Sequence, residues 1–491
     1  MWFRLIRRCL YCLLLFVAVS CSDSDEPRIV YITATPADNA PVGVPLVPTA
    51  IPSPITANDP VVITNPTVNP PRLLSAPLET VDEHIVQAGD TLSGIALSYG
   101  VSVNAILAVN EIINPDTLFV GQQIRLPAEP TETTPALKIL SDARLIRAPG
   151  SRDFDIAGFI QSQSGYIRQA TDEVTTRLSD GSEQVDISNA AQIIERVSLN
   201  FSVDPRLLLA LLEHRAGWLS QTQLPITLIT HPLISENNSG SIDRSGLYRQ
   251  LNWAANILNF GYYGWQIRGW ATLEFPSGIR LRYDEGLNAG TVGVYYFLSL
   301  FNEYEVWLRE IAQNGFLATY VSLFGDPFTD VIDPVVHLNL AQPELTFPFA
   351  SGETWFFTGG AHGGWGSGSA WSAIDFAPPD DPPEGVFCYT SNYWARAVAP
   401  GLIVRSGNGS VLLDLDGDGD ESTGWVILYL HIAEADRIQE GTYANIGDTI
   451  GRPACAGGFS SATHMHIARR FNGEWIPADC QRCSQQISRP T

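Results

Sequence analysis

Basic residues are scarce in this chain. Lysine and arginine together number 29 against 52 aspartates and glutamates, the net charge is -23, and Lys138 is the only lysine among the 491 residues. Because binding to a phosphate backbone requires basic patches, this charge balance excludes nucleic acid as an expected partner. Histidine is also scarce, with 8 residues in the chain. A cluster of histidines is therefore more informative here than in a chain of average composition.

The amino end lacks an apolar run long enough to span a bilayer comfortably. Three arginines precede the apolar run Cys9–Val19, a pattern typical of a secretion signal over residues 1–20. The run ends in Ala18-Val19-Ser20-Cys21, which resembles the lipobox of bacterial lipoproteins. The resemblance implies lipidation of Cys21 and a membrane anchor, whereas ordinary secretion with cleavage nearby is the alternative. Both interpretations predict a mature protein that works outside the cytoplasm, and the lipid anchor would hold it at the cell envelope.

Two segments have the composition of linkers. Residues 21–83 are rich in proline, threonine and alanine and show neither helical nor strand periodicity, so we expect an extended tether. A shorter linker is expected at residues 128–137. The region between them is predicted to be a compact domain.

Residues 84–127 have the pattern of a small βααβ unit. A short strand begins at His84, a turn with Thr91 offers a helix cap, and the chain returns as a strand at Gly121–Leu126. The stretches GDTLSGIA, YGVSV, LAVN and VGQQIRLP resemble the LysM domain over its full length. This resemblance implies binding of glycans that contain N-acetylglucosamine, usually peptidoglycan or chitin; a βααβ module with another ligand is the alternative. The implied groove is formed by Gly89, Asp90, Thr91, Leu92, Ile113, Asn114 and Pro115.

Residues 138–340 predict a mostly α-helical domain. Asp204 is a cap, Pro205 occupies the first turn, and an apolar run follows. This segment resembles the opening helix of lysozyme-like transglycosylases. Their general-acid glutamate would fall where Arg215 stands, and Glu213 lies at the wrong offset. We therefore expect a catalytically inactive lysozyme-like domain; a glycosidase built on Glu213 and a structural spacer are the alternatives.

The last part of the chain, residues 341–491, concentrates histidines in a β pattern. Short apolar or alternating runs separated by glycine-rich turns predict a mainly antiparallel β domain. His464 and His466 are two residues apart, so they face the same way on a strand. Asp375 lies between apolar neighbours, and a buried carboxylate must be neutralised or bound. Histidine and aspartate side chains placed in this way could form a metal site. The alternative is that the histidines only pack against their neighbours in the strands.

Three separate stretches, GGAHGGWGSGSAWSAIDF, VILYLHIA and THMHI, match the motifs of one known family in both order and spacing. They resemble the lysostaphin/LytM group of zinc endopeptidases (metallopeptidase family 23), in particular its β-lytic, or staphylolytic, subgroup. The resemblance implies that His362, Asp375 and His466 bind one Zn²⁺ and leave a fourth position for water. It also implies that His431 and His464 orient the water, move protons and stabilise the oxyanion.

Four cysteines follow Cys21 in the sequence, and all lie in residues 341–491. An even set outside the cytoplasm favours two disulfides, although the C-x-x-C pair could instead indicate a metal site. The same family resemblance implies the pairs Cys388–Cys455 and Cys480–Cys483.

An acidic loop offers a candidate for a second metal. Asp414, Asp416 and Asp418 have the spacing of a Ca²⁺-binding loop. Trp425 stands where the closing glutamate of such a loop is expected, and strand-like sequence flanks it on both sides. An acidic hairpin turn is therefore the alternative.

Together these features predict a multidomain protein with a LysM module, a mostly α-helical middle domain and a C-terminal antiparallel β peptidase domain. We expect a zinc endopeptidase that cuts peptide crosslinks or stems of peptidoglycan and is held to the wall by LysM and to the membrane by a lipid. One alternative is a secreted metalloendopeptidase that acts on glycine-rich protein. The other is a catalytically idle, wall-binding scaffold.

Overall fold

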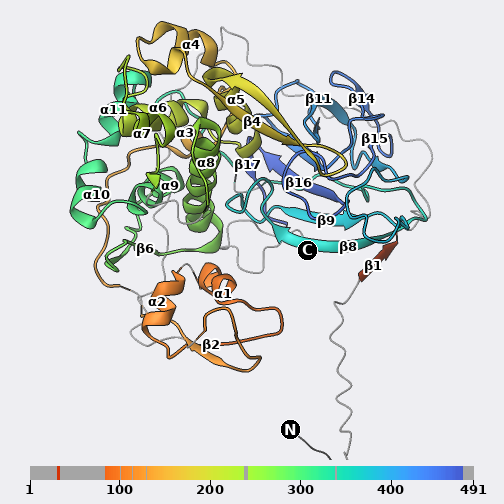
Figure 1. Cartoon of the computed structure of the whole chain (residues 1–491), viewed down its shortest axis with the longest axis horizontal. Helices are drawn as coiled ribbons and strands as arrows, with labels where there is room; N and C mark the ends of the chain where they lie inside the picture. Colours follow the sequence, from red (N-terminus) through yellow and green to blue (C-terminus); the bar gives the residue numbers. More distant parts are fainter. Residues whose placement is uncertain are drawn as a thin grey trace, which may run out of the picture.

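The computed structural model describes residues 30–33, 83–99, 101–112, 114–128, 130–236, 242–337 and 340–478. It has three parts: a small βααβ unit, a helical middle region and an antiparallel sheet (Figure 1). The predicted fold class is therefore confirmed. Three further predictions lie outside the described residues: Ile113 in the glycan groove, lipidation of Cys21, and the Cys480–Cys483 pair. Within the described residues, none of the helices combines the length and apolar character that crossing a bilayer requires.

The βααβ unit folds around a small apolar core. Its elements are β2 (Glu83–Ile85), α1 (Leu92–Tyr99), α2 (Val103–Ala108) and β3 (Gln123–Arg125), with β2 and β3 antiparallel. The Thr91 hydroxyl accepts a hydrogen bond from the Gly94 N–H at 3.0 Å, which is the predicted cap. The Leu92 side chain is buried in the core, so this groove residue could contact a glycan only through its backbone.

The linker after this unit lies along the helical region. The Arg282 N–H donates to the Glu132 carbonyl at 2.7 Å, and the Thr134 N–H donates to the Arg282 carbonyl at 2.8 Å. The Ser102 hydroxyl of the βααβ unit donates to Glu274 Oε1 at 2.7 Å. These bonds hold the small unit against the helical region.

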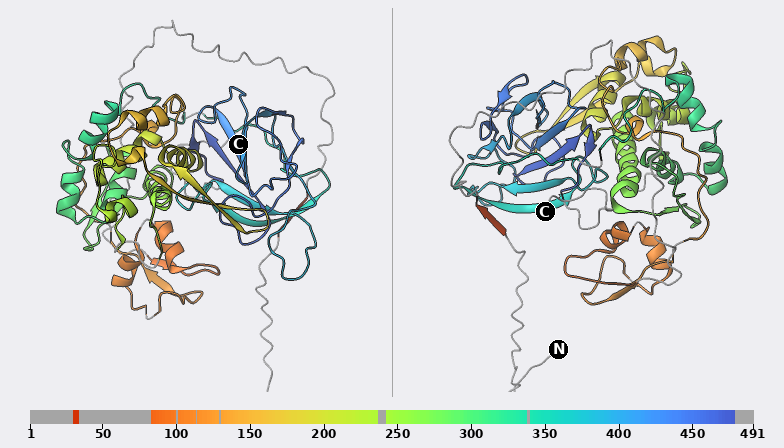
Figure 2. Two further views of the ribbon diagram at one scale, coloured as in Figure 1. Left: turned by 45° about the horizontal axis from the view of Figure 1, so that its top comes forward. Right: turned by 180° about the vertical axis from the view of Figure 1, so that it is seen from behind.

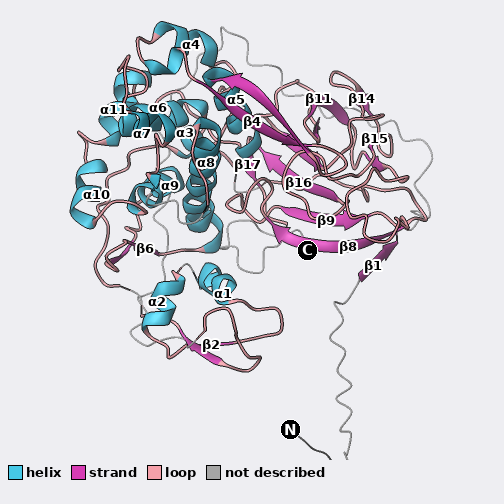
Figure 3. Cartoon of the chain, in the orientation of Figure 1, coloured by secondary structure: helices cyan, strands magenta, loops and turns pink. Residues whose placement is uncertain are grey.

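The middle region is built mainly from helices, which lie together on one side of the molecule (Figure 3). They are α3 (Asp142–Leu145), α4 (Ile156–Ser162), α5 (Ala190–Phe201), α6 (Pro205–Ala216), α7 (Ile226–Thr230), α8 (Leu247–Tyr263), α9 (Ala289–Ser299), α10 (Tyr304–Glu310) and α11 (Phe316–Phe324), with short turns η1 (Tyr166–Arg168) and η3 (Gly264–Arg268). The sequence predicts the start of α6 correctly, because Asp204 accepts from the Arg206 N–H and Pro205 opens the helix.

Glu213 and Arg215, the two residues of α6 that bear on a glycosidase function, both make contacts within the helical region. The Glu213 carboxylate accepts from the backbone N–H groups of Leu219 at 2.8 Å and Ser220 at 3.1 Å. The Arg215 guanidinium lies 4.2 Å from the centre of the Phe301 ring. These contacts favour the expectation that the middle region is not a working glycosidase.

Two hairpins interrupt the helices of the middle region. They are β4 (Thr171–Arg177) with β5 (Glu183–Asn189), and β6 (Thr272–Glu274) with β7 (Arg280–Arg282). The β4–β5 hairpin reaches from the helices to the sheet (yellow in Figures 1 and 2). There the Gly457 N–H donates to the Arg177 carbonyl at 2.8 Å, and the Cys455 N–H donates to the Ser179 carbonyl at 3.2 Å. The hairpin therefore joins the middle region to a loop of the β domain.

The C-terminal domain is an antiparallel sheet, as predicted. Its strand order is β1-β8-β9-β16-β13-β12-β11-β14, with β17 paired to β16 and with β10 and β15 paired separately. The strands are β8 (Thr354–His362), β9 (Ala373–Ala377), β10 (Ala395–Arg396), β11 (Gly401–Gly407), β12 (Ser410–Asp414), β13 (Trp425–Leu430), β14 (Tyr443–Ala444), β15 (Thr449–Gly451), β16 (Met465–Phe471) and β17 (Glu474–Trp475).

The structure departs from the tether prediction at four residues. Val30–Thr33 form β1, which pairs antiparallel with Thr354–Phe357 of β8. An edge strand has unpaired N–H and C=O groups, and any short extended segment can satisfy them. The sequence Val-Tyr-Ile-Thr is rich in β-forming residues, so it can pair within an otherwise irregular stretch.

The helical region and the sheet share one apolar core. Side chains alternate along β13: Val426 and Leu428 pack with the helices, whereas Ile427 and Tyr429 pack in a second core on the other face. The Trp475 N–H donates to the Tyr263 hydroxyl at 2.9 Å across this contact. The β domain therefore uses the helices to cover one face of its sheet.

A buried carboxyl at this contact makes stability depend on pH. Glu474 Oε2 accepts from the Tyr262 hydroxyl at 3.0 Å, and burial, followed by the Asp142 carboxylate, raises the pKa of Glu474 to about 8. Between pH 4.5 and about 8, the Glu474 carboxyl therefore keeps its proton in the folded state but loses it in the unfolded state. Because the folded state binds more protons, the free energy of unfolding falls as the pH rises through this range. In this window the wild type should lose on the order of 1.4 kcal/mol per pH unit relative to Glu474→Gln.

Urea titrations across that pH range test the prediction. Glu344→Gln is the matched control, because Glu344 is exposed and should follow the wild-type profile. Parallel profiles for the wild type and Glu474→Gln would show that Glu474 is ionised throughout and would contradict the prediction.

Candidate metal centre

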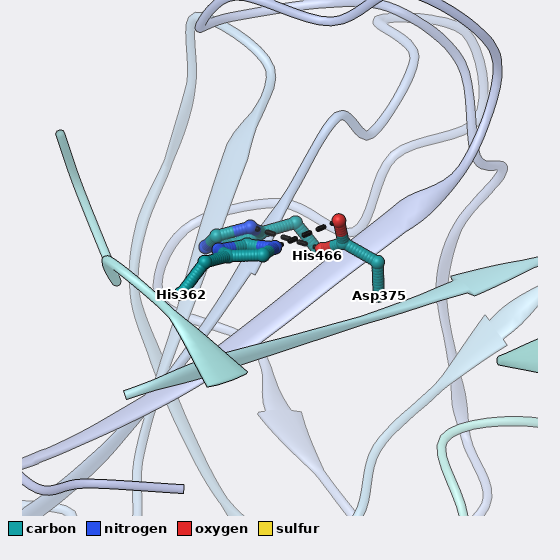
Figure 4. Close-up of side chains that lie close together, drawn as sticks. All are labelled: His362, Asp375 and His466. Carbon is teal, nitrogen blue, oxygen red and sulfur yellow. Dashed lines mark hydrogen bonds and ion pairs between the residues drawn. The ribbon is translucent and has the colours of Figure 1, made fainter. Parts of the chain in front are cut away.

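Three neighbouring strands bring the three predicted ligands together. His362 ends β8, Asp375 lies in β9 and His466 lies in β16, where it stands directly opposite Asp375 in the strand register. His362 Nε2 is 2.8 Å from Asp375 Oδ2, and His466 Nδ1 is 3.2 Å from Asp375 Oδ1 (Figure 4). One ligand atom of each residue lies within 4.8 Å of the others. The spacing suits three ligands of a single ion.

The hydrogen bonds of the two imidazoles fit a bound cation. His362 Nδ1 is 3.2 Å from the Gly363 carbonyl, and His466 Nε2 is 3.0 Å from the Gly364 carbonyl. A carbonyl only accepts, so these two nitrogens carry the protons, and the nitrogens that face Asp375 present lone pairs. Asp375 Oδ1 is buried and has no hydrogen-bond partner among the described residues. The lone pairs of two imidazole nitrogens and of a carboxylate repel one another unless a positive charge lies between them. The three residues therefore fit a bound metal ion.

Glycine is required in the loop that supplies these carbonyls. A Cβ at Gly363 would lie 1.7 Å from the Gly366 carbonyl oxygen, and a Cβ at Gly364 would lie 2.4 Å from the Ser372 hydroxyl. The backbone therefore passes closer to its neighbours than any side chain permits. This close turn aims both carbonyls at the histidines.

The carboxylate of the site is ionised. Burial opposes the charge on Asp375, but without an ion His362 and His466 could turn a proton toward the carboxylate, and this outweighs burial and holds the pKa of Asp375 below its ordinary value. Two imidazoles and one charged carboxylate form a donor set found in catalytic zinc sites, which leave a coordination position open.

The other two predicted histidines lie beside this group. The ring centroids of His431 and His464 are 4.5 Å apart, and His464 Nε2 is 3.5 Å from Asp375 Oδ2. His431 Nδ1 donates to the Ala456 carbonyl at 2.9 Å, and His464 Nδ1 donates to the Ala462 carbonyl at 2.8 Å. In the neutral form of each ring, Nε2 is therefore the unprotonated nitrogen. Burial, followed by the neighbouring His464 and His466, holds the pKa of His431 well below its ordinary value, so this ring is neutral.

The backbone that places His431 is unusual. The residue follows β13 and has a φ of 66°, a conformation that residues other than glycine seldom adopt. Its hydrogen-bond acceptor, Ala456, follows Cys455, which is bonded to Cys388 in the pairing that the resemblance implies. The β4–β5 hairpin binds the same loop at Cys455 and Gly457. The disulfide and the hairpin therefore both support the loop that orients His431.

Removal of this disulfide should lower stability. The bond joins residues that are 67 positions apart in the sequence. Closing a loop of that size contributes about 4 kcal/mol to the free energy of unfolding, because it restricts the unfolded chain. A variant with Cys388→Ser and Cys455→Ser should lose roughly that free energy of unfolding in denaturant titrations. Equal stability of the double variant and the wild type would contradict this expectation.

The metal group lies in a cleft of about 660 Å³ with a wall from the middle region. That wall is formed by Thr175, Arg177, Glu183, Arg196, Asn200, Phe201, Tyr248 and Asn252. Arg196 Nη2 donates to the Thr176 hydroxyl at 2.9 Å. In the part of the chain that the structure describes, neither Arg177 nor Arg196 has an ion-pair partner. Sequence analysis did not identify these residues, because only the packing of separate segments brings them to the cleft.

The acidic loop forms the hairpin turn between β12 and β13. Asp414 accepts from the backbone N–H groups of Asp416 at 3.2 Å and Gly419 at 3.0 Å. The Asp414, Asp416 and Asp418 carboxylates lie close together, but the hydrogen bonds of a turn account for the acidic spacing without an ion. Calcium at this loop stays a prediction.

Comparison with known protein families relates two parts of the chain to named domains. Residues 84–127 match the LysM domain, and residues 138–337 match the family described as "LasA, N-terminal domain". The chain contains a LysM domain and a LasA-type N-terminal domain. The LysM prediction is thus confirmed. The second match relates the helical region to LasA, rather than to the lysozyme-like enzymes that the sequence of α6 suggested.

Protease LasA from Pseudomonas aeruginosa is 20% identical to this chain over 309 residues, which cover 59% of the chain and 68% of LasA. The chain is homologous to this protease. The amidase XlyB from Bacillus subtilis is 46% identical over 48 residues, which cover 10% of this chain and 15% of the amidase.

Solved structures of peptidases are also similar to this chain. The M23 metalloprotease pseudoalterin, from the deep sea, is 26% identical over 28% of this chain and 76% of its own, with a TM-score of 0.23. The catalytic domain of lysostaphin from Staphylococcus simulans is 21% identical over 25% of this chain and 88% of its own, with a TM-score of 0.18.

Proposed function

We propose that the chain is a zinc-dependent endopeptidase that hydrolyses peptide bonds in the crosslinks or stems of peptidoglycan. The observation that carries this proposal is the convergence of His362, Asp375 and His466 in a cleft, with two further histidines beside them. Homology to protease LasA supports a peptidase, and the LysM domain supports peptidoglycan as the substrate.

The proposed zinc ligands are His362, Asp375 and His466. When bound there, zinc would polarise the carbonyl of the scissile bond and acidify a water molecule. The Gly363 and Gly364 carbonyls hold the two imidazoles in the tautomers that this role requires.

His431 and His464 are proposed to move protons. Each ring lines the cleft, and in its neutral form Nε2 is the unprotonated nitrogen, because the Nδ1–H is bound to a carbonyl. Nε2 can take a proton from the attacking water and pass it to the leaving amine. Once protonated, the same nitrogen can donate a hydrogen bond to the oxyanion. The neutral state of the buried His431 suits it to accept the first proton.

The remaining parts would hold the enzyme at its substrate. The LysM groove predicted around Asp90 and Asn114 would bind the glycan. The protein would work outside the cytoplasm, where Cys21 would carry a lipid and the following tether would give reach.

Metal removal tests the proposed function. Chelation should abolish the release of soluble fragments from purified peptidoglycan, because the cleft then loses its electrophile, and zinc at one equivalent per chain should restore the release. Magnesium should not restore it, since this ion prefers oxygen ligands to imidazole. Full release by protein shown to be free of metal would contradict the proposal.

A further inference from the structure

A second cavity lies between the LysM domain and the helical region. Its volume is about 560 Å³, which is within the range of ligand pockets. One side is formed by residues of α1, α2 and the loop between them, including Ser93 and Ser102. The other side comes from α8, α9 and the β6–β7 hairpin, where Figure 1 shows α1 and α2 beside β6. This cavity is separate from the loops that form the predicted LysM groove.

One wall of the cavity is aromatic. The rings of Phe260 and Trp270 are stacked, with centroids 6.3 Å apart and planes within 13°. A Cβ at Gly264 would lie 2.0 Å from the Trp270 ring, so this indole is seated directly against the backbone. A flat, fixed aromatic face of this kind can pack against the apolar face of a ring-shaped ligand.

Two tyrosine hydroxyls of the cavity form no hydrogen bond with the described residues. Tyr283 is only 2% exposed, and neither its hydroxyl nor that of Tyr296 forms a hydrogen bond with the described residues. Burial, followed by the adjacent Tyr296, raises the pKa of Tyr283, so its hydroxyl stays protonated. A hydroxyl that faces a cavity can both donate and accept, so it usually has a protein, solvent or ligand partner. Here a ligand could supply that partner.

The charges in the cavity favour a neutral ligand. Glu274 accepts from Ser102 at one oxygen, and Arg280 Nε lies 3.9 Å from its other oxygen. The carboxylate and guanidinium therefore offset one another, and the cavity has no surplus positive charge for an anion. Hydroxyl and amide groups on a ring would suit the two tyrosine hydroxyls better than a charged group, and the ring itself could pack on the flat face of the indole.

We propose that this cavity binds a neutral N-acetylated sugar residue of a glycan strand. The proposal rests on peptidoglycan as the substrate but not on the zinc chemistry. Helix α8 joins the two sites, since Asn252 lines the metal cleft and Phe260 lines this cavity, about 12 Å farther along the helix. Trp270 also contacts Trp371, four residues before Asp375, with ring centroids 6.3 Å apart. A sugar held here would keep its peptide near the cleft.

Binding of a hexamer of N-acetylglucosamine to the full chain, measured by calorimetry, tests this site. The variant with Tyr283→Phe and Tyr296→Phe keeps both rings and removes both hydroxyls. Loss of two hydrogen bonds should weaken binding about tenfold. Tyr166→Phe is the control, because Tyr166 packs against Trp218 and does not line the cavity. Its affinity should equal that of the wild type.

Two further variants make the outcome decisive. His466→Ala should bind the hexamer like the wild type, so a failure of the peptidase function would leave this result unchanged. Asn114→Ala, in the predicted LysM groove, should weaken binding independently of the tyrosine pair. Wild-type affinity in the double tyrosine variant would overturn the proposal. So would a tenfold loss in Tyr166→Phe, because the effect would then not depend on the cavity.

Discussion

The His466→Ala protein should purify without stoichiometric zinc and release peptidoglycan fragments roughly a thousandfold or more slowly than the wild type. The reason is geometric: His466 Nδ1 faces Asp375 Oδ1 at 3.2 Å, and among the described residues no other imidazole nitrogen occupies that position. Because the Asp375 carboxylate would also lose a partner that stabilises its charge, its pKa should rise. Zinc content by atomic spectroscopy and fragment release measured on the same sample check both effects.

His337→Ala is the matched control for this loss. His337 is an exposed histidine outside the cleft, so its replacement should change neither zinc content nor the rate of release. Stoichiometric zinc in His466→Ala would contradict the ligand assignment. An equal loss in His337→Ala would show that the effect is not specific to the site.

Replacement of His431 by asparagine should separate metal binding from catalysis. The asparagine amide can still donate to the Ala456 carbonyl, but it cannot take a proton at the position of Nε2. Zinc should stay at one equivalent per chain, while kcat falls by roughly a hundredfold to ten-thousandfold. His464→Asn should behave in the same way, because its Nδ1–H also binds a carbonyl and its ring lies beside His431.

Zinc content decides how a loss of activity in these variants is interpreted. A variant that loses both zinc and activity would identify His431 or His464 as a ligand, contrary to the assignment made here. A variant that keeps both would remove that residue from the proposed proton transfer. Circular dichroism on each sample shows whether the fold is retained.

The sequence was sufficient to identify the candidate metal centre because its chemistry is carried by rare residues in strands. Alternation in a strand places His464 and His466 on one side, and an acid between apolar residues points to a buried carboxylate. The cap of α6 was predicted from its local pattern, whereas the LysM domain and the full ligand set were predicted from family resemblance. These features depend on local pattern, which a single sequence preserves.

Features that depend on packing between distant segments were not accessible. Arg177 and Arg196 reach the cleft only because the β4–β5 hairpin and α5 lie beside the sheet. The segment 171–189 alternates as a strand should, but nothing local shows that its turn binds the loop at Cys455. The cavity beside the LysM domain likewise exists only because Ser102 and the linker fix that domain against β6 and β7.

Buried charge was the other source of missed structure. Glu421, at the end of the acidic loop, receives hydrogen bonds from Arg405 at 3.0 Å and Arg470 at 2.6 Å. Nothing in the local sequence distinguishes this glutamate from the aspartates of the same loop. Its role as the partner of two arginines follows from a strand register that composition does not reveal.

Mass spectrometry of the fragments that the zinc-loaded protein releases from purified peptidoglycan tests the central claim most directly, with His466→Ala measured alongside. Our account predicts fragments with newly formed peptide ends, present with the wild type and absent with the variant. Fragments with new reducing or anhydro sugar ends that persist with the variant would contradict it, because the active region would then be the helical one. The absence of any fragment, from protein shown to hold one zinc, would contradict peptidoglycan as the substrate.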